Sequence, residues 1–209
     1  GKAHFGAKDT SGENPLNLGF DVNIAGHAAG GPGSYWAKYN FSADWRSPGN
    51  HIWDVPGLEK YHGTDIFLTE ALTLEANEAI NTAVEEKKPF YLYMSHYAIH
   101  APWEKDDRFY QKYIDAGLSE FDATYASMLE GMDKSLGDIR ANLKRLGVDD
   151  NTVIVFMSDN GAPKQAARNL PLRGHKISPY EGGTRVNKLT FQKLIPQKQR
   201  NWLVCLQST

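Results

Sequence analysis

Two short apolar segments on either side of a long amphipathic one constrain the fold of this chain more than any other feature. Residues 90–94 are Phe-Tyr-Leu-Tyr-Met and residues 153–157 are Val-Ile-Val-Phe-Met, which is typical of buried strands. Between them, apolar residues recur at helical spacing over residues 119–147. A strand, a helix and a strand make a βαβ unit with parallel strands. The sequence therefore predicts an α/β fold, with a mostly parallel sheet covered by helices on both faces.

The segment before the first strand divides into two parts. Residues 1–63 are rich in glycine, proline, asparagine and aromatic residues and show no period, which predicts long ordered loops. Residues 64–88 carry apolar side chains at helical spacing and predict a second long helix. In the helix between the strands, Ser119 with Asp122 resembles a capping box, and Gly147 suits a C-terminal cap.

Charge and composition exclude several kinds of partner. The 23 basic and 25 acidic residues are interspersed and give a net charge of −2, so no broad field favours nucleic acid or an anionic membrane. No apolar run approaches the ~20 residues that a membrane-spanning helix needs. The single cysteine, Cys205, cannot form an internal disulfide, and we assign it no role. Partners must therefore be predicted from local sites.

Polar clusters follow both predicted strands, where open α/β sheets bind their ligands. The first strand leads into residues 95–102, which include two histidines, and the second leads into Asp159 and Asn160. Carboxylate and amide oxygens suit calcium or magnesium, while lysines and a histidine suit an anionic ester. Singly, each feature is more often a turn, a structural histidine or a surface lysine. Together they indicate a metal-assisted site for a sulfate or phosphate ester.

Six motifs in a fixed order resemble a known family. They are Gly-Lys-x-His-x-Gly at 1–6, Gly-Phe-Asp at 19–21, Gly-Gly-Pro-Gly-Ser-Tyr at 30–35, His-x-Pro at 100–102, Ser-Asp-Asn-Gly at 158–161, and Arg-Gly-x-Lys followed by Tyr-Glu-Gly-Gly-x-Arg-Val within 173–186. This series resembles the type I sulfatases, the arylsulfatase family of the alkaline-phosphatase superfamily. The resemblance implies that residues 1–186 are an incomplete sulfatase catalytic domain. Residues 187–209 are basic, lack acidic side chains and form an unassigned tail.

The resemblance implies an enzyme, a sulfuric ester hydrolase, and assigns its catalytic side chains. Lys2 and Lys176 match the lysines that hold the sulfate oxygens, and Lys176 also matches the lysine near the leaving oxygen. His4 matches the histidine that hydrogen-bonds the nucleophile. His100 matches the histidine that protonates the departing alcohol. His96 precedes the matching position, and we expect it to be structural or to lie behind the site.

The resemblance also implies a calcium ion and a formylglycine nucleophile. Asp159 and Asn160 match two of the calcium ligands. In the family, a hydrated aldehyde made from Cys/Ser-x-Pro/Ala-x-Arg attacks sulfur, and two further aspartates complete the metal site. Neither the nucleophile motif nor those aspartates can be matched in this chain, and we expect both upstream of Gly1 in the complete protein. The chain alone is therefore expected to bind metal weakly or not at all and to be inactive.

Two other functions stay open. A phosphomono- or phosphodiesterase of the same superfamily would share the sheet, although such enzymes typically use two zinc ions held by several His and Asp ligands. A catalytically inactive sulfatase-like protein would retain only a carbohydrate- or partner-binding surface. The expected substrate is a small-molecule or glycan sulfate ester, and tryptophan and tyrosine in the first 60 positions suit sugar stacking as well as loop packing. The resemblance implies an exported (periplasmic or extracellular) or lysosomal protein, and the oligomeric state cannot be predicted.

Overall fold

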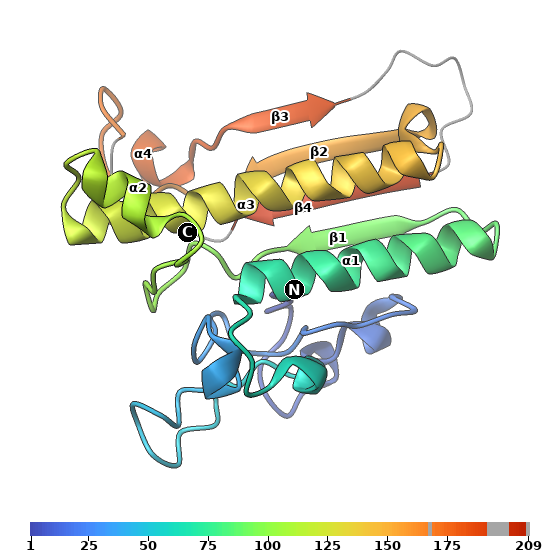
Figure 1. The fold of residues 1–209 in the computed structure, drawn as a ribbon, viewed down its shortest axis with the longest axis horizontal. Coiled ribbons are helices and arrows are strands. Elements are labelled where there is room, and N and C mark those ends of the chain that lie inside the picture. Colours follow the sequence, from blue (N-terminus) through green and yellow to red (C-terminus); the bar gives the residue numbers. More distant parts are fainter. Residues whose placement is uncertain (167–168, 192–200, 208–209) are drawn as a thin grey trace.

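The four strands form one sheet in the order β1-β4-β2-β3 (Figure 1). The computed structural model describes residues 1–166, 169–191 and 201–207, so part of the tail predicted at its C-terminal end lies outside the described residues. The strands are β1 (Tyr91–Ser95), β2 (Thr152–Ser158), β3 (Lys188–Phe191) and β4 (Asn201–Gln207). β4 is parallel to both β1 and β2, and β3 is antiparallel to β2. The predicted α/β class with a mostly parallel sheet is confirmed.

β4 lies between the two predicted strands, although it comes from the tail to which the sequence assigned no element. Leu203 of β4 pairs with Leu92 of β1 and with Ile154 of β2. Leu203 and Cys205 are both buried in the core. Burial raises the pKa of the Cys205 thiol to about 12, so this cysteine is a neutral, apolar core side chain. The tail therefore contributes the strand that joins β1 to β2.

Two long helices occupy the segments predicted to be helical. They are α1 (Leu68–Glu85) and α3 (Glu120–Arg145). The Ser119 side chain accepts a hydrogen bond from the backbone N–H of Asp122, at 3.1 Å, and so caps the first turn of α3 as predicted. Gly147 follows the end of α3 with φ +70°, a left-handed conformation that glycine adopts at low cost.

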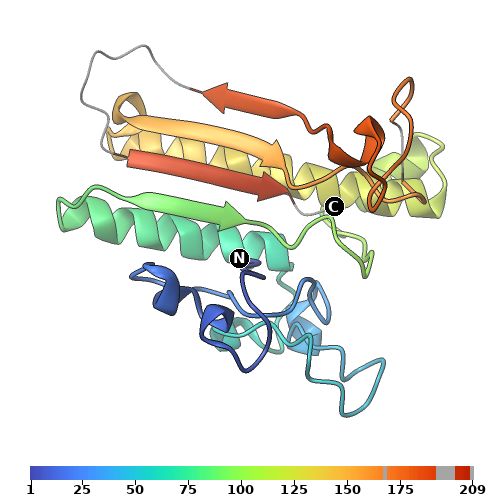
Figure 2. The ribbon, with the colours of Figure 1, turned by 180° about the vertical axis from the view of Figure 1, so that it is seen from behind.

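Both long helices lie side by side on the same face of the sheet (Figures 1 and 2). The described residues place no long helix on the other face, where we had also expected helical cover. Tyr91 and Tyr93 of β1 contact aromatic residues of the N-terminal segment. Phe5 lies 5.6 Å from Tyr93 between ring centroids, and Phe20 lies 6.4 Å from Tyr91. Aromatic packing thus replaces a helix beside β1.

The first 63 residues form ordered loops that lie beside β1 and α1 at one edge of the sheet (Figure 1). Tyr35 and Phe41 are fully buried there, and the Tyr35 ring stacks on buried Phe67, just before α1, with the centroids 5.4 Å apart. Aromatic burial of this kind orders a segment that has little regular structure. Its short 3₁₀ helices are η1 (Ser11–Glu13), η2 (Pro15–Leu18), η3 (Ala37–Tyr39) and η4 (Glu59–Tyr61).

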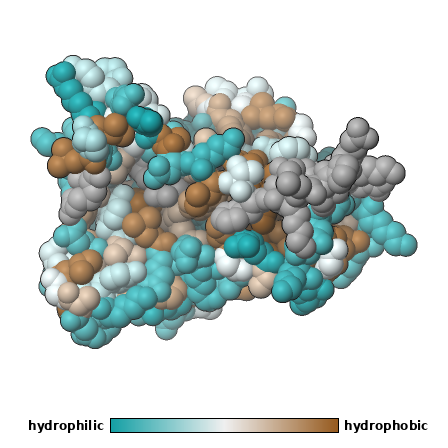
Figure 3. All heavy atoms as spheres, turned by 90° about the horizontal axis from the view of Figure 1, so that it is seen from above, coloured by the Kyte–Doolittle hydropathy of each residue, from teal (hydrophilic) through white to brown (hydrophobic). Residues whose placement is uncertain are grey.

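The remaining elements are short. They are α2 (Tyr110–Asp115), η5 (Asp149–Asn151) and α4 (Glu181–Thr184). The face seen in Figure 3 is mainly hydrophilic along the outer surface of α3 and shows hydrophobic side chains beside it, toward the sheet. Within the described ranges, no helix combines the length and the hydropathy that crossing a lipid bilayer requires.

Candidate active site

The start of the chain lies at the carboxyl end of β1, where the polar clusters converge. The backbone N–H of Lys2 donates a 2.8 Å hydrogen bond to the carbonyl of Ser95, the last residue of β1, and the Ser95 hydroxyl donates to the carbonyl of Lys2. Figures 1 and 2 both show the N-terminus beside this end of the strand. One backbone hydrogen bond and one from the Ser95 side chain thereby join residues 93 positions apart and place Lys2 at the carboxyl end of β1.

Lys2 meets the loop that follows β2. Its Nζ lies 3.4 Å from Oδ2 of Asp159, and the two side chains are only 13% and 28% exposed. Partial burial weakens solvent screening, so this pair interacts more strongly than a surface ion pair. The contact brings the Gly-Lys-x-His-x-Gly motif at 1–6 and the Ser-Asp-Asn-Gly motif at 158–161 together.

Lys176 is held beside the same loop by backbone contacts. Its N–H donates a 2.9 Å hydrogen bond to the carbonyl of Ala162, and the N–H of Gly161 donates a 3.0 Å bond to the carbonyl of Gly183. A Cβ on Gly161 would lie 2.0 Å from the carbonyl oxygen of Gly182. Only glycine permits this close approach between the two loops.

The charged groups at this edge influence one another. Burial lowers the pKa of Lys176, the charge of Lys2 lowers it further, and the carboxylate of Asp159 opposes both effects. The pKa of His100 is lowered chiefly by burial and also by Lys176 and Lys2, while its hydrogen bond to Ala101 and the charge of Asp159 raise it. Lys2, Lys176 and His100 therefore share one electrostatic environment, which includes the carboxylate of Asp159.

The hydrogen bond of His100 fixes which ring nitrogen faces the site. Nδ1 lies 2.8 Å from the carbonyl oxygen of Ala101. A carbonyl only accepts, so Nδ1 carries a hydrogen and donates it. Nε2 is left as the nitrogen that can accept or donate a proton at the site.

Two glycines bring the two predicted catalytic histidines to one segment of backbone. A Cβ on Gly30 would lie 2.8 Å from Cε1 of His4, and a Cβ on Gly31 would lie 2.9 Å from Nδ1 of His100. The backbone N–H of His4 also donates a 3.0 Å hydrogen bond to the carbonyl of His27. His4 and His100 thus pack against adjacent residues, and a side chain at either glycine would push a histidine away.

A carboxylate that the sequence did not single out supports this segment. Glu104 accepts hydrogen bonds from the Ser34 hydroxyl at 2.8 Å and from the Tyr35 N–H at 2.7 Å. The Tyr35 hydroxyl lies 2.7 Å from the carbonyl of Tyr97 and 2.8 Å from that of His100, so it ties the glycine segment to the histidine loop. Burial raises the pKa of Glu104, and the two hydrogen bonds oppose that rise. In the sequence, the only indication of this contact was Ser34-Tyr35 at the end of the motif at 30–35, the two residues that Glu104 binds.

His96 is buried away from these groups, as expected for a structural residue. Its Nε2 lies 3.3 Å from the Ser135 hydroxyl on α3, which in turn accepts from Thr73 on α1. Burial lowers the pKa of His96 to about 3, so the ring is neutral at ordinary pH. It links β1 to both long helices.

The donor set for a metal ion is of the right kind but too small. Asp159 and Asn160 lie in the loop after β2, and the carbonyl of Asn160 accepts from the Ser158 hydroxyl at 2.7 Å. Their carboxylate and amide oxygens suit calcium, which prefers about 6–8 oxygen ligands. Among the described residues there is no group of three or more His, Cys, Asp and Glu side chains placed to hold a metal ion. Further ligands would be needed from elsewhere.

The chain thus forms a mostly parallel α/β sheet with lysine and histidine side chains near its carboxyl edge. The sulfatase family model matches residues 1–204, and the chain belongs to the sulfatase family, whose members generally bind calcium.

Named relatives and a solved structure agree with this family. Mouse arylsulfatase J is 28% identical over 207 residues, a match that covers 95% of this chain and 32% of that protein. Mouse N-acetylgalactosamine-6-sulfatase is 30% identical over 198 residues, covering 88% and 35%. The crystal structure of Ps i-CgsB in complex with k-i-k-neocarrahexaose superposes with a TM-score of 0.75 and 29% identity, covering 99% of this chain and 46% of that one. The chain spans about a third of the length of these curated relatives.

Proposed function

We propose that the complete protein hydrolyses a sulfate ester to an alcohol and inorganic sulfate. The observation that supports this function best is the electrostatic coupling of Lys2, Lys176 and His100 around Asp159, in a chain of the sulfatase family. Two ammonium groups and an imidazole suit the charge of a sulfate group and the negative charge that develops on its leaving oxygen. Residues 1–186 hold all of the proposed site residues, and the tail adds β3 and β4 to the same sheet.

Lys2 and Lys176 would hold the sulfate oxygens. Both lie at the carboxyl edge of the sheet in partly buried surroundings, where charge interactions are stronger than in water. Asp159 keeps the two ammonium groups from repelling one another fully before the substrate arrives. Lys176 would also stabilise the leaving oxygen as the sulfur–oxygen bond breaks.

His100 would donate the proton that the leaving oxygen needs. Its Nδ1 is engaged with Ala101, so the proton would move from Nε2. Burial and two nearby lysines lower the pKa of His100, which makes the imidazolium a stronger acid. A bound sulfate would offset the charge of the lysines and favour protonation of the ring when substrate is present. His4, which packs against Gly30, would hydrogen-bond the nucleophile.

Formylglycine and calcium are the groups that the family implies in addition. Formylglycine supplies a strong oxygen nucleophile, and this chain contains no motif from which it could be made. Asp159 and Asn160 would provide two oxygens of the calcium site, with the remaining ligands and the nucleophile coming from parts of the complete protein beyond this chain. By itself the chain is expected to be inactive.

The substrate would be a small-molecule or glycan sulfate ester. Among the similar proteins, one is named for N-acetylgalactosamine 6-sulfate and another is solved with neocarrahexaose, which supports a carbohydrate ester. By family resemblance, the complete protein would be exported or lysosomal.

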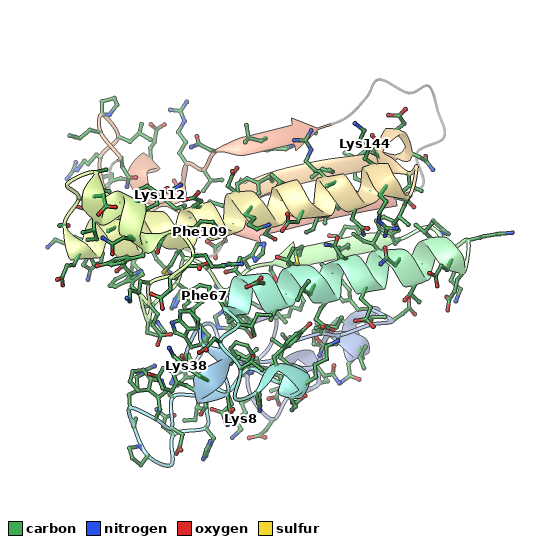
Figure 4. All side chains as sticks on the ribbon, in the orientation of Figure 1. Lys8, Lys38, Phe67, Phe109, Lys112 and Lys144 are labelled. Carbon is green, nitrogen blue, oxygen red and sulfur yellow. The ribbon has the colours of Figure 1, made fainter. Side chains whose placement is uncertain are left out.

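The test uses the complete protein and a chromogenic aryl sulfate, with calcium present. We expect Lys176→Ala and His100→Ala each to reduce kcat/KM by roughly 10²–10³-fold, the usual cost of removing one group that stabilises the transition state. Lys144→Ala is the matched control, because Lys144 is an exposed lysine toward the far end of α3 (Figure 4). Unchanged turnover in both site variants would disprove the assigned roles, and absence of turnover in the wild-type protein would disprove the function.

A further inference from the structure

The loop segment of residues 38–62 contains a pocket. It is separate from the lysines and histidines of the candidate active site. It has a volume of about 530 Å³, within the usual range for small-molecule sites. Its main lining residues are Tyr39, Ser42, Asp44, Trp45, His51 and Asp54. We propose that this pocket binds an uncharged sugar unit of the substrate, next to the unit that carries the scissile sulfate. The proposal rests on the proposed function and narrows its substrate to a glycan.

The pocket adjoins the segment against which His100 packs. Gly31 lies against His100, and Gly33, two residues on, packs against Ser42 in the pocket wall, where a Cβ would lie 2.4 Å from its carbonyl carbon. The Gly33 N–H donates a 2.6 Å bond to the carbonyl of Trp53, and Arg46 donates to the carbonyl of Gly33 at 3.0 Å. The pocket wall and His100 are thus packed against one short stretch of backbone, residues 31–33.

Trp45 gives the pocket a flat apolar surface. Its ring stacks on Tyr39 with centroids 4.4 Å apart and an interplanar angle of 16°, so Tyr39 supports it rigidly. The Trp45 side chain nevertheless remains 49% exposed. Lys38, beside Tyr39 on η3, places its ammonium over the rings of Trp36 and Tyr39. A held, half-exposed indole next to polar groups suits the apolar face of a pyranose ring.

The polar groups of the pocket suit hydroxyl groups. His51 lies between two carboxylates, with Nδ1 2.9 Å from Asp54 and Nε2 3.8 Å from Asp44. The side chains of His51, Asp44 and Asp54 are 63%, 53% and 38% exposed, so their polar atoms can be reached from the pocket. A sugar presents many hydroxyls that donate to carboxylates and exchange hydrogen bonds with an imidazole. These groups can therefore orient a saccharide on Trp45.

The charge of the pocket is opposite to that of the sulfate site. Asp44, Asp54 and Glu59 line it, and Lys38 is its one permanently charged cation among the described lining residues. A sulfate group placed here would be repelled by the carboxylates, whereas neutral hydroxyls would donate to them. The pocket thus selects a non-sulfated neighbouring unit, while Lys2 and Lys176 select the sulfated one.

The test compares sulfate esters that differ only in the neighbouring unit, using the complete protein. The panel contains sulfated galactan and glycosaminoglycan fragments in three forms: a sulfated monosaccharide, the same unit joined to a neutral sugar, and the same unit joined to a sulfated sugar. For the best-cleaved series, we expect the neutral neighbour to raise kcat/KM roughly tenfold, and Trp45→Ala to remove that advantage, as loss of a central aromatic contact does. Trp45→Phe should retain most of it.

The ratio of kcat/KM between two substrate forms isolates the effect of this pocket. A variant that impairs folding or catalysis lowers kcat/KM for both forms equally, so the ratio does not change. The double variant Asp44→Asn with Asp54→Asn should narrow the discrimination against a sulfated neighbour. Tyr91→Ala is the matched control, since Tyr91 is an exposed aromatic at the opposite end of β1. The inference is overturned if no oligosaccharide has a higher kcat/KM than its sulfated monosaccharide. It is also overturned if Trp45→Ala still cleaves the form with a neutral neighbour at the higher kcat/KM. If even an aryl sulfate is not cleaved, the proposed function fails, and this inference fails with it.

Discussion

The helix-covered core and the carboxyl edge of the sheet are assembled by different means. In the core, apolar side chains at regular spacing meet across elements, as Leu143 of α3 and Leu203 of β4 do in one buried cluster. At the edge, glycines and single hydrogen bonds bring Lys2, Asp159 and Lys176 together from distant segments. Burial of apolar side chains stabilises the fold, whereas bringing the positive charges of Lys2 and Lys176 together at the edge lowers its stability. Substitutions should therefore divide into those that affect folding and those that affect chemistry.

Two leucines on the same helix give the largest expected effect. Leu143 is fully buried and Leu129 is 39% exposed, both on α3. Leu143→Ala should lower the free energy of unfolding by roughly 2–5 kcal/mol, the cost of lost transfer and a cavity, while Leu129→Ala should cost under about 1 kcal/mol. Urea unfolding of the two variants measures both. Equal losses would mean that α3 does not face the sheet as described.

Two glycines sharpen the same comparison at the edge. Gly161→Ala places a methyl group 2.0 Å from the Gly182 carbonyl, so the loop holding Lys176 must shift, at a cost of about 1–3 kcal/mol and with loss of sulfatase activity. Gly137→Ala is its control on α3, where a Cβ meets no atom within 4 Å. Alanine there should raise stability by about 0.5–1 kcal/mol. Unfolding curves and kcat/KM, measured together, would contradict the comparison if Gly161→Ala kept full activity.

The core elements could be predicted from sequence because their signals are local. Helical spacing identified α1 and α3, and Ser119 and Gly147 identified the ends of α3. β4 was not predicted, since its seven residues lie in a basic tail and its place between β1 and β2 depends on pairing across more than 40 residues. The placement of both long helices on one face of the sheet was not predicted either, because it depends on how the connections between strands pack.

The edge was predicted only as a set of residues. Motif order singled out Lys2, His4, His100 and Lys176, but not the geometry that joins them. Glu104 was missed because its contacts with Ser34 and Tyr35 span about 70 positions, and nothing near Glu104 in the sequence marks them. The pocket around Trp45 was foreseen only as aromatic residues that suit sugar stacking or packing. Local patterns thus predict elements, while long-range polar contacts require the fold.

A pH-dependent effect separates two histidines four residues apart. His96 is buried against Ser135, and burial lowers its pKa to about 3, whereas His100 is half-buried at the edge and its pKa is lowered less. A histidine with a depressed folded-state pKa stabilises the fold above its unfolded pKa of about 6.5, and that stability is lost as the pH falls. The buried, neutral His96 should therefore lower the free energy of unfolding by about 1.4 kcal/mol for each pH unit below about 6.5.

Urea unfolding between pH 7 and 4.5 tests this difference. His96→Gln keeps a polar group for Ser135 but takes up no proton, so the fall of stability with decreasing pH should become shallower by nearly one proton. His100→Gln should change that slope less, because water reaches part of the ring, while it changes the pH profile of kcat/KM. Identical slopes in wild type and His96→Gln would show that His96 is not buried in the folded protein. The two substitutions thus test, at neighbouring positions, whether burial and catalysis are separated at the end of β1.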